Sequence, residues 1–193
     1  MKNKIKQAIL ESINTYTFIF NNDKIQESIE MIVKQSVKAL KNEKKILFCG
    51  NGGSAADAQH LAAELSGKFN FERPPLYAEA LHVNSSYMTA VANDFGYIET
   101  YSRMLEACGK EGDILIAIST SGNSSNVLQA VKKANDIGLT TIGLTGKIGG
   151  NMNDICDIMI KIPSKKTAKT QEAHILVGHI ICELIEEQMF SNV

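Results

Sequence analysis

The chain has 193 residues, 44% of them hydrophobic, and its 20 basic and 21 acidic side chains give a net charge of −1. This length and composition indicate one globular domain with a sizeable core. The balanced charge gives no reason to expect nucleic acid or an anionic membrane as a partner. The polar start lacks the apolar stretch of a signal peptide, and no segment is apolar enough to span a bilayer, so we expect a cytoplasmic protein.

Two amphipathic helices are expected before any strand. Apolar residues recur at helical spacing over residues 5–20 and 25–40, on either side of a polar break. Residues 45–49 then form a short apolar run that ends at Gly50, which is typical of a buried parallel strand. A helix is expected to follow from Ser54, a residue type that often caps the start of a helix.

Strands and helices alternate along the rest of the chain. Further apolar runs occupy residues 76–81, 114–118, 140–144 and 155–162, with helical stretches over 126–137 and 170–189. This alternation predicts an α/β fold, a three-layer doubly wound sandwich around a mostly five-stranded parallel sheet, with right-handed crossovers. We therefore interpret residues 1–193 as a single domain whose ligands bind beyond the carboxyl ends of the strands.

Two loops between a strand and a helix have the composition of a phosphate site. The first is Cys49-Gly50-Asn51-Gly52-Gly53-Ser54, and the second is Ser119-Thr120-Ser121-Gly122-Asn123-Ser124. Glycines let the backbone approach a ligand, and free amides, hydroxyls and a helix N-terminus together neutralise a phosphate without lysine. Ordinary turns use the same residue types, so either loop alone leaves that alternative open.

A dinucleotide site is the rival interpretation of the first loop. Residues 50–55 fit the pattern G-x-G-x-x-G/A after a strand. That site also needs an acidic residue at the end of the next strand to bind a ribose, but Glu79 falls within the predicted strand and His82 follows it. A mononucleotide P-loop is disfavoured because neither loop contains Gly-Lys-Ser/Thr.

Three polar side chains on the predicted helices are candidates for chemistry. His60 and Glu64 are four residues apart, so both emerge on one face of a helix, where they can bind a metal or share a proton. A solvated surface pair is the alternative interpretation. His179 lies among apolar residues of the last helix, where a buried core histidine is an equally good interpretation.

Other features have a structural interpretation. His82 and His174 are interpreted as structural, and Asn93-Asp94-Phe95-Gly96 has the composition of an ordinary turn. The four cysteines lie far apart without C-x-x-C spacing, which argues against a thiolate zinc site or a redox pair. Their apolar neighbours indicate buried, reduced thiols.

Four motifs occur in order along the chain, at residues 49–54, 93–96, 118–124 and 144–147. Together they closely resemble the phosphoheptose isomerase family of the SIS (sugar isomerase) domain superfamily. The resemblance covers nearly the whole chain, including the two leading helices and the terminal helix. It implies an enzyme that isomerises the ketose sedoheptulose 7-phosphate to the aldose D-glycero-D-manno-heptose 7-phosphate through an enediol, which supplies heptose for lipopolysaccharide or capsule.

The resemblance also implies roles for individual residues. Glu64 would be the base at one carbon, and His179 would move protons at the oxygens or from the opposite side. One zinc ion per subunit would be bound by His60, Glu64, Gln171 and His179. The implied substrate-binding positions are Asn51, Gly52, Gly53, Glu64, Asn93, Asp94, Ser119, Thr120, Ser121, Ser124 and Gln171, with the second loop around the phosphate.

Assembly and departures from the family complete this interpretation. The resemblance implies a homotetramer in which residues 1–42, a helical extension, pack between subunits. Ala55-Ala56 replace bulkier or polar residues of some members, and residues 167–170 lack an acidic residue, which bears on an auxiliary carboxylate and on substrate preference. The alternative is a non-catalytic SIS tetramer that binds a replication initiator or senses a sugar phosphate. Retention of Glu64, Gln171 and His179 favours the enzyme.

Overall fold

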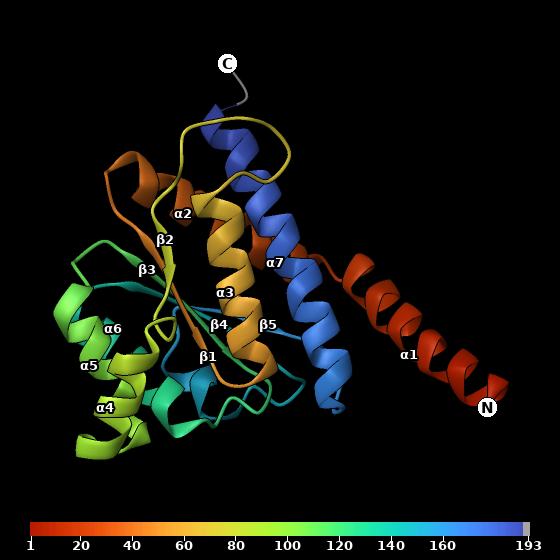
Figure 1. Cartoon of the computed structure of the whole chain (residues 1–193). Coiled ribbons are helices and arrows are strands. Elements are labelled where there is room, and N and C mark those ends of the chain that lie inside the picture. Colours follow the sequence, from red (N-terminus) through yellow and green to blue (C-terminus); the bar gives the residue numbers. More distant parts are fainter. Residues whose placement is uncertain (191–193) are drawn as a thin grey trace.

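Five strands form one parallel sheet in the computed structural model, which describes residues 1–190 (Figure 1). They are β1 (Ile46–Gly50), β2 (Ala78–Ala80), β3 (Ile114–Ser119), β4 (Thr140–Thr145) and β5 (Ile158–Lys161). Their order is β2-β1-β3-β4-β5, and all neighbouring pairs are parallel. The chain leaves β1 in one direction to form β2 and returns to its other side to form β3. The topological switch point, where such sheets bind ligands, therefore lies between β1 and β3.

Helices cover both faces of the sheet. One face carries α2 (Asp23–Lys41), α3 (Gly53–Ser66) and α7 (Thr167–Phe190), and the other carries α5 (Thr100–Cys108) and α6 (Ser125–Ile137). Strand residues alternate between the two cores: Ile46 and Phe48 pack in the first, and Leu47 and Cys49 in the second. The remaining helices are α1 (Lys2–Phe20), α4 (Ser85–Phe95) and the 3-10 helices η1 (Tyr97–Glu99) and η2 (Gly150–Asp154).

The predicted α/β sandwich is confirmed, although two strands are shorter than their apolar runs. β2 omits Leu76 because the N–H of this residue donates to Leu65 at the end of α3 rather than to β1. β5 omits Ile155 because its N–H donates to the carbonyl of Met152 and so ends η2. Both residues still bury apolar surface, which is why periodicity alone extends the strands over them.

The start of α3 differs from the prediction. Its N-cap is Gly52, with φ of +58°, no side chain caps it, and Ser54 lies in the first turn with 3% of its surface exposed. The expectation that Ser54 is the cap was therefore wrong. A glycine in the left-handed region tightens the turn after β1, so the helix begins one residue earlier. The cysteines are free as expected, but only Cys49 and Cys182 are fully buried.

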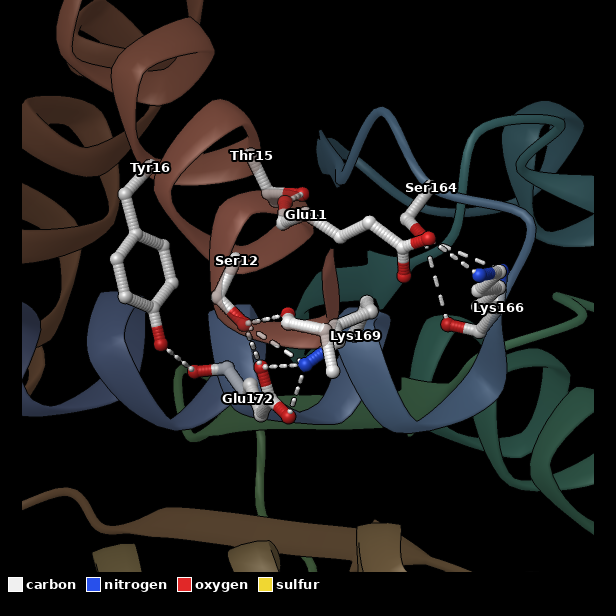
Figure 2. A network of polar contacts seen from close by, with 9 residues as sticks. Glu11, Ser12, Thr15, Tyr16, Ser164, Lys166, Lys169 and Glu172 are labelled. Carbon is white, nitrogen blue, oxygen red and sulfur yellow. Dashed lines mark hydrogen bonds and ion pairs between the residues drawn. The ribbon is translucent and has the colours of Figure 1, made fainter. Parts of the chain in front are cut away.

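α1 lies outside the sandwich and projects from it beside α7 (Figure 1). A polar network joins the two helices, as Figure 2 shows: Lys169 Nζ donates to Ser12 at 2.8 Å, and Ser12 donates to Glu172 at 2.6 Å. Lys166 forms an ion pair with Glu11 at 2.6 Å. α2, by contrast, contributes its apolar face to the same core as α3 and α7. Within residues 1–190, the helices include none that is long and apolar enough to cross a lipid bilayer.

Candidate active site

Three of the predicted site residues, His60, Glu64 and His179, lie close together on α3 and α7. On α3, His60 Nε2 lies 2.9 Å from Glu64 Oε1, because the two side chains are one turn apart. On α7, His179 Nε2 lies 3.1 Å from His60 Nε2. The ligand atoms of these three residues, which we call the His–Glu cluster, all lie within 4.8 Å of one another. The fold thus joins two segments that are far apart in the sequence.

Close packing between α3 and α7 produces this contact. Leu61 occupies the space beside Gly178, where an added Cβ would lie 2.5 Å from Leu61 Cδ1. At the start of α3, a Cβ on Gly53 would collide with the carboxamide of Gln171. The two helices therefore run in the same direction, with Gln171 beside Gly53 and Gly178 beside Leu61. At 1.5 Å per residue, the level of Gly53 and Gln171 lies about 10 Å along the axis of α3 before His60.

The His–Glu cluster has the donor set of a zinc site. Imidazole nitrogen and carboxylate oxygen are ordinary zinc ligands, and three protein ligands with one open position are usual in catalytic sites. His60 Nε2 faces both a carboxylate oxygen and a second imidazole nitrogen, whereas a neutral imidazole carries one proton on one of its two nitrogens. Three lone-pair donors thus converge with too few protons between them, a geometry that a cation stabilises. The His60 side chain is 47% exposed, so solutes reach the cluster.

Two carboxamides connect the first predicted loop to the start of α6 at the switch point. Asn51 Nδ2 donates to Asn126 Oδ1 at 2.8 Å, and Asn126 Nδ2 donates to Asn51 Oδ1 at 3.0 Å. The hydroxyl of Tyr97 donates to the same oxygen of Asn51 at 2.9 Å. Asn126, in the first turn of α6, is only 3% exposed. The side chain of Asn51 is therefore committed to joining the loops, so we expect this residue to present its backbone to a ligand.

The second loop gathers its hydroxyls at the start of α6. Ser119 Oγ lies 3.0 Å from Ser124 Oγ and 3.4 Å from Ser121 Oγ. Ser124 is the N-cap residue of α6, but its side chain makes no capping hydrogen bond. These hydroxyls therefore stand at the positive end of a helix, where an anion is stabilised. Gly122 has φ of +66°, and a Cβ there would collide with the carbonyl of Gly149, so only glycine fits.

The His–Glu cluster and the second loop line different hollows of the single chain. A hollow of ≈ 560 Å³ is lined by Ala56, Gln59, His60, Ala63 and Glu64. A second hollow of ≈ 370 Å³ is lined by residues that include Thr120, Ser121, Lys147, Lys165, Thr167 and Thr170.

Asn93 and Asp94 form the last turn of α4 rather than an isolated turn, and only Gly96, with φ of +91°, ends the helix as a turn residue. Both side chains are exposed, and Asn93 Nδ2 donates to Asp94 Oδ1 at 2.8 Å. Because Tyr97 follows directly and bonds to Asn51, the end of α4 lies beside the first loop.

Some residues of the site have no signal in the sequence. Asn126 and Tyr97 are far from Asn51 along the chain, so only the fold reveals their contact. Asp57 carries a readable signal, since it lies one turn before His60 on α3. Its Oδ2 is buried without a hydrogen-bond partner in residues 1–190. Burial raises the pKa of Asp57 to about 6, although the charge of His60 opposes this shift.

His174 is structural, as predicted. Its side chain is buried and Nε2 lies 3.1 Å from the carbonyl of Thr145, so Nε2–H donates to this oxygen. Burial lowers the pKa of His174 to about 4, although this hydrogen bond opposes the shift. His82 is also partly buried, and burial lowers its pKa. Both rings are therefore neutral near pH 7.

Comparisons with known proteins agree along the whole chain. A family model described as the SIS domain matches residues 13–146. The phosphoheptose isomerase of Clostridium acetobutylicum is 49% identical over 192 residues, which cover 100% of this chain and 98% of that protein. Among solved structures, a phosphoheptose isomerase from Francisella tularensis has a TM-score of 0.92 at 37% identity, covering 96% of this chain and 97% of the other. The phosphoheptose isomerase from Neisseria gonorrhoeae has a TM-score of 0.90 at 38% identity, with coverage of 96% and 98%.

Proposed function

Since this chain belongs to the phosphoheptose isomerases of the SIS domain family, we propose that it converts sedoheptulose 7-phosphate to D-glycero-D-manno-heptose 7-phosphate. The observation that carries this proposal is the contact between Glu64 and two histidines from α3 and α7. An aldose–ketose isomerisation needs a base at carbon and a proton carrier between oxygens. The cluster supplies both within a few ångströms.

Glu64 is proposed as the base. It takes a proton from C1 of the ketose while the C1–C2 double bond forms and the C2 oxygen gains a proton, which gives the enediol. The aldose forms when the C1 oxygen loses its proton, C1 becomes the carbonyl carbon and C2 gains the proton that Glu64 took from C1. His179 is proposed to move the proton between the two oxygens. Its ring contacts His60, which in turn contacts Glu64, the proposed base.

A zinc ion is proposed as the cofactor, with His60, Glu64 and His179 as ligands. Gln171 is the fourth ligand that the family resemblance implies, and in this structure its carboxamide lies against Gly53 at the start of α3. When bound, the ion would polarise the sugar carbonyl and stabilise the negative charge that develops on the sugar oxygens. A carboxylate bound to a cation is a weaker base, so zinc binding would lower the basicity of Glu64.

The phosphate is proposed to bind at the second loop. The hydroxyls of Ser119, Ser121 and Ser124 and the N-terminus of α6 form a site for its oxygens. The first loop meets Gln171 at the start of α3, because a Cβ on Gly53 would collide with its carboxamide. In this proposal the sugar extends past them, with its phosphate at the second loop and C1–C2 at the His–Glu cluster.

The proposal is tested by assaying isomerisation of sedoheptulose 7-phosphate by the metal-free protein, before and after zinc is added. We expect Glu64→Gln and His179→Ala to lower kcat by about 10²- to 10⁴-fold with the fold retained, as for loss of a general base or acid. Glu106→Gln, at a side chain that is 65% exposed on α5, is the matched control. Near-normal turnover in both site variants would refute the roles assigned to them.

The alternatives give different results in the same assay. A non-catalytic SIS protein would be inert with zinc present, and it would not need the His–Glu cluster, which is therefore the feature against it. A dinucleotide-binding protein would bind NAD(H) in a titration. We further propose a cytoplasmic location and a supply of heptose to lipopolysaccharide or capsule, as the family resemblance implies.

A homotetramer is proposed, with α1 between subunits. Ile5, Ile9 and Ile13 recur at helical spacing on α1, and each is 52% to 55% exposed. An apolar groove of ≈ 430 Å³ lies between α1, α2 and α7. Exposed apolar surface of this kind marks an interface. Light scattering tests it: we expect Ile9→Asp to lower the mass to that of smaller species, whereas Asn14→Asp on the same helix leaves it unchanged.

A further inference from the structure

A buried ion pair joins α7 to the loop that follows α3. Arg73 Nε lies 2.8 Å from Glu186 Oε1, and both side chains are only 1% exposed. The carboxylate of Glu186 also accepts hydrogen bonds from the N–H groups of Phe69 at 2.9 Å and Asn70 at 2.6 Å. Burial alone raises the pKa of Glu186, but the two amides and Arg73 together bring it below its ordinary value. Glu186 is therefore charged near pH 7.

The guanidinium of Arg73 also closes the carboxyl end of α3. It donates to the carbonyl of Glu64 at 2.9 Å, of Leu65 at 2.7 Å and of Gly67 at 2.8 Å. These are carbonyls of the last turn, which lack partners within the helix and form the negative end of its dipole. Arg73 thus contacts the backbone of the proposed base itself.

Glu186, the other partner of the ion pair, belongs to α7, the helix that carries His179. Glu186 lies two turns after His179 on α7. The loop that it binds carries Phe69, whose ring centroid is 5.7 Å from that of His179. Figure 1 shows the segment between α3 and β2 arching over the end of α7. One ion pair therefore contacts the helix of Glu64, the helix of His179 and the backbone of Phe69, the residue whose ring packs on His179.

We propose that Arg73 and Glu186 are positioning residues for the isomerisation, because they fix α3 and α7 at the spacing that brings Glu64, His60 and His179 together. This inference rests on the proposed function. Stability alone does not require the pair, since apolar residues of similar volume often replace a buried ion pair without loss. Directed bonds to five backbone groups, two amides of one loop and three carbonyls at one helix end, provide what apolar packing lacks, a defined spacing.

The chain offers a matched control in the ion pair of Lys45 and Asp113, just before two inner strands of the sheet. Lys45 Nζ lies 2.6 Å from Asp113 Oδ2, with side chains 7% and 1% exposed. Asp113 also accepts from the N–H groups of Lys45 and Lys110, so it resembles Glu186 in burial and in its partners. Lys45 and Asp113 stand just before β1 and β3, at the amino ends of the strands, away from the His–Glu cluster.

The experiment compares Glu186→Gln and Arg73→Lys with Asp113→Asn. Urea unfolding gives their stability, steady-state kinetics give kcat and KM, and titration of the metal-free proteins with Zn²⁺ gives zinc affinity. We expect all three variants to lose stability. Only the Arg73 and Glu186 variants should lose about 10-fold or more in kcat with little change in KM, and about 10- to 100-fold in zinc affinity.

A second variant keeps the test decisive if single substitutions unfold the chain. Arg73→Met combined with Glu186→Leu removes both charges, so we expect it to regain stability while kcat and zinc affinity stay low. Wild-type kcat and zinc affinity in this double variant would overturn the inference, as would equal losses in Asp113→Asn. If the wild type shows no isomerase activity, the proposed function fails, and the zinc titration still decides whether the pair positions the cluster.

Discussion

His60 and His179 are 119 positions apart in the sequence, yet their Nε2 atoms lie 3.1 Å apart. Two neutral imidazoles at this distance share one hydrogen bond if one of the nitrogens carries a proton. With Glu64 Oε1 at 2.9 Å from the same nitrogen of His60, the three atoms offer more acceptors than donors. Imidazole nitrogens and a carboxylate oxygen are ordinary zinc ligands, which is the basis of the cofactor proposed above.

We therefore predict that the metal-free protein binds close to one Zn²⁺ per chain. His60→Ala and His179→Ala should each weaken binding by more than the roughly 10- to 100-fold that loss of an outer-shell partner causes, because a direct ligand is lost. Isothermal titration with Zn²⁺ alone measures this, without reference to activity. His174→Gln is the control, since that ring faces Thr145 and not the cluster.

Equal zinc affinity in all four proteins would show that the cluster is only a hydrogen-bonded contact. Loss in the His174 variant alone would indicate a different site. Either result would remove the cofactor from the proposed mechanism and leave the fold assignment intact.

The sequence predicts the fold and the candidate site unequally, for physical reasons. Short runs of mostly apolar residues identify β1 and β3, because strands covered on both faces contain few charged side chains. His60 and Glu64 are readable as neighbours because the helix period fixes their spacing. The partner of His60 is not readable in this way, since its position depends on how α3 packs on α7 around Gly178.

The periodicity of apolar residues also does not predict contacts between segments that are far apart in the sequence. Asn126 looks like any polar residue in the first turn of a helix, and Arg73 looks like a solvated loop residue. Their burial, 3% exposure for Asn126 and 1% for the Arg73 side chain, follows only from the folded chain. Family resemblance supplied the role of His179, whereas neither periodicity nor resemblance indicated these two residues.

Loss of a hydroxyl in the second loop should weaken substrate binding. Ser124→Ala removes one donor from the group around Ser119 without removing a capping hydrogen bond of α6. A hydrogen bond to a charged group contributes about 1.5 to 3 kcal/mol, so we expect KM for the sugar phosphate to rise about 10- to 100-fold. The value of kcat should change little, because the phosphate is bound equally in the ground state and the transition state.

Ser125→Ala is the matched control, since this exposed serine is the next residue and begins α6. Inorganic phosphate, titrated as a competitive inhibitor, should lose affinity in the Ser124 variant and not in the Ser125 variant. An unchanged inhibition constant in both would place the phosphate elsewhere.

Breaking the carboxamide pair between the loops should impair the enzyme while leaving α6 intact. Asn126→Asp replaces the donor that faces Asn51 Oδ1 at 3.0 Å by an acceptor, with almost no change in volume. A carboxylate in the first turn is favourable for the helix itself. We expect kcat/KM to fall about tenfold or more, because two acceptors now face each other and the loops separate.

Asn135→Asp tests whether any such exchange on α6 has this effect. Asn135 also donates to a distant carbonyl, that of Ile155, and accepts from Thr141, but it lies at the far end of the helix from the loops. Both variants should lose stability in urea, and only Asn126→Asp should lose activity. Equal kinetics in the two variants would contradict the role given to the pair.

His174 should make the stability of the protein depend on pH. Burial lowers its pKa from 6.5 to about 4, so between these values the unfolded chain binds a proton that the folded chain does not. The free energy of unfolding therefore falls as the pH drops from 6.5 toward 4, by up to about 1.4 kcal/mol per pH unit from this group. Above pH 6.5 the contribution is constant, because the ring is neutral in both states.

His174→Gln retains a donor for the carbonyl of Thr145 but cannot take up a proton. Urea unfolding at about pH 7 and about pH 5 should show that the wild type loses about 2 kcal/mol more than the variant between the two values. Other acidic groups titrate equally in both proteins and cancel in this difference. Parallel losses would mean that water or a second partner reaches His174 Nδ1 and lets the buried ring accept a proton, so that His174 does not contribute to the acid sensitivity of the fold.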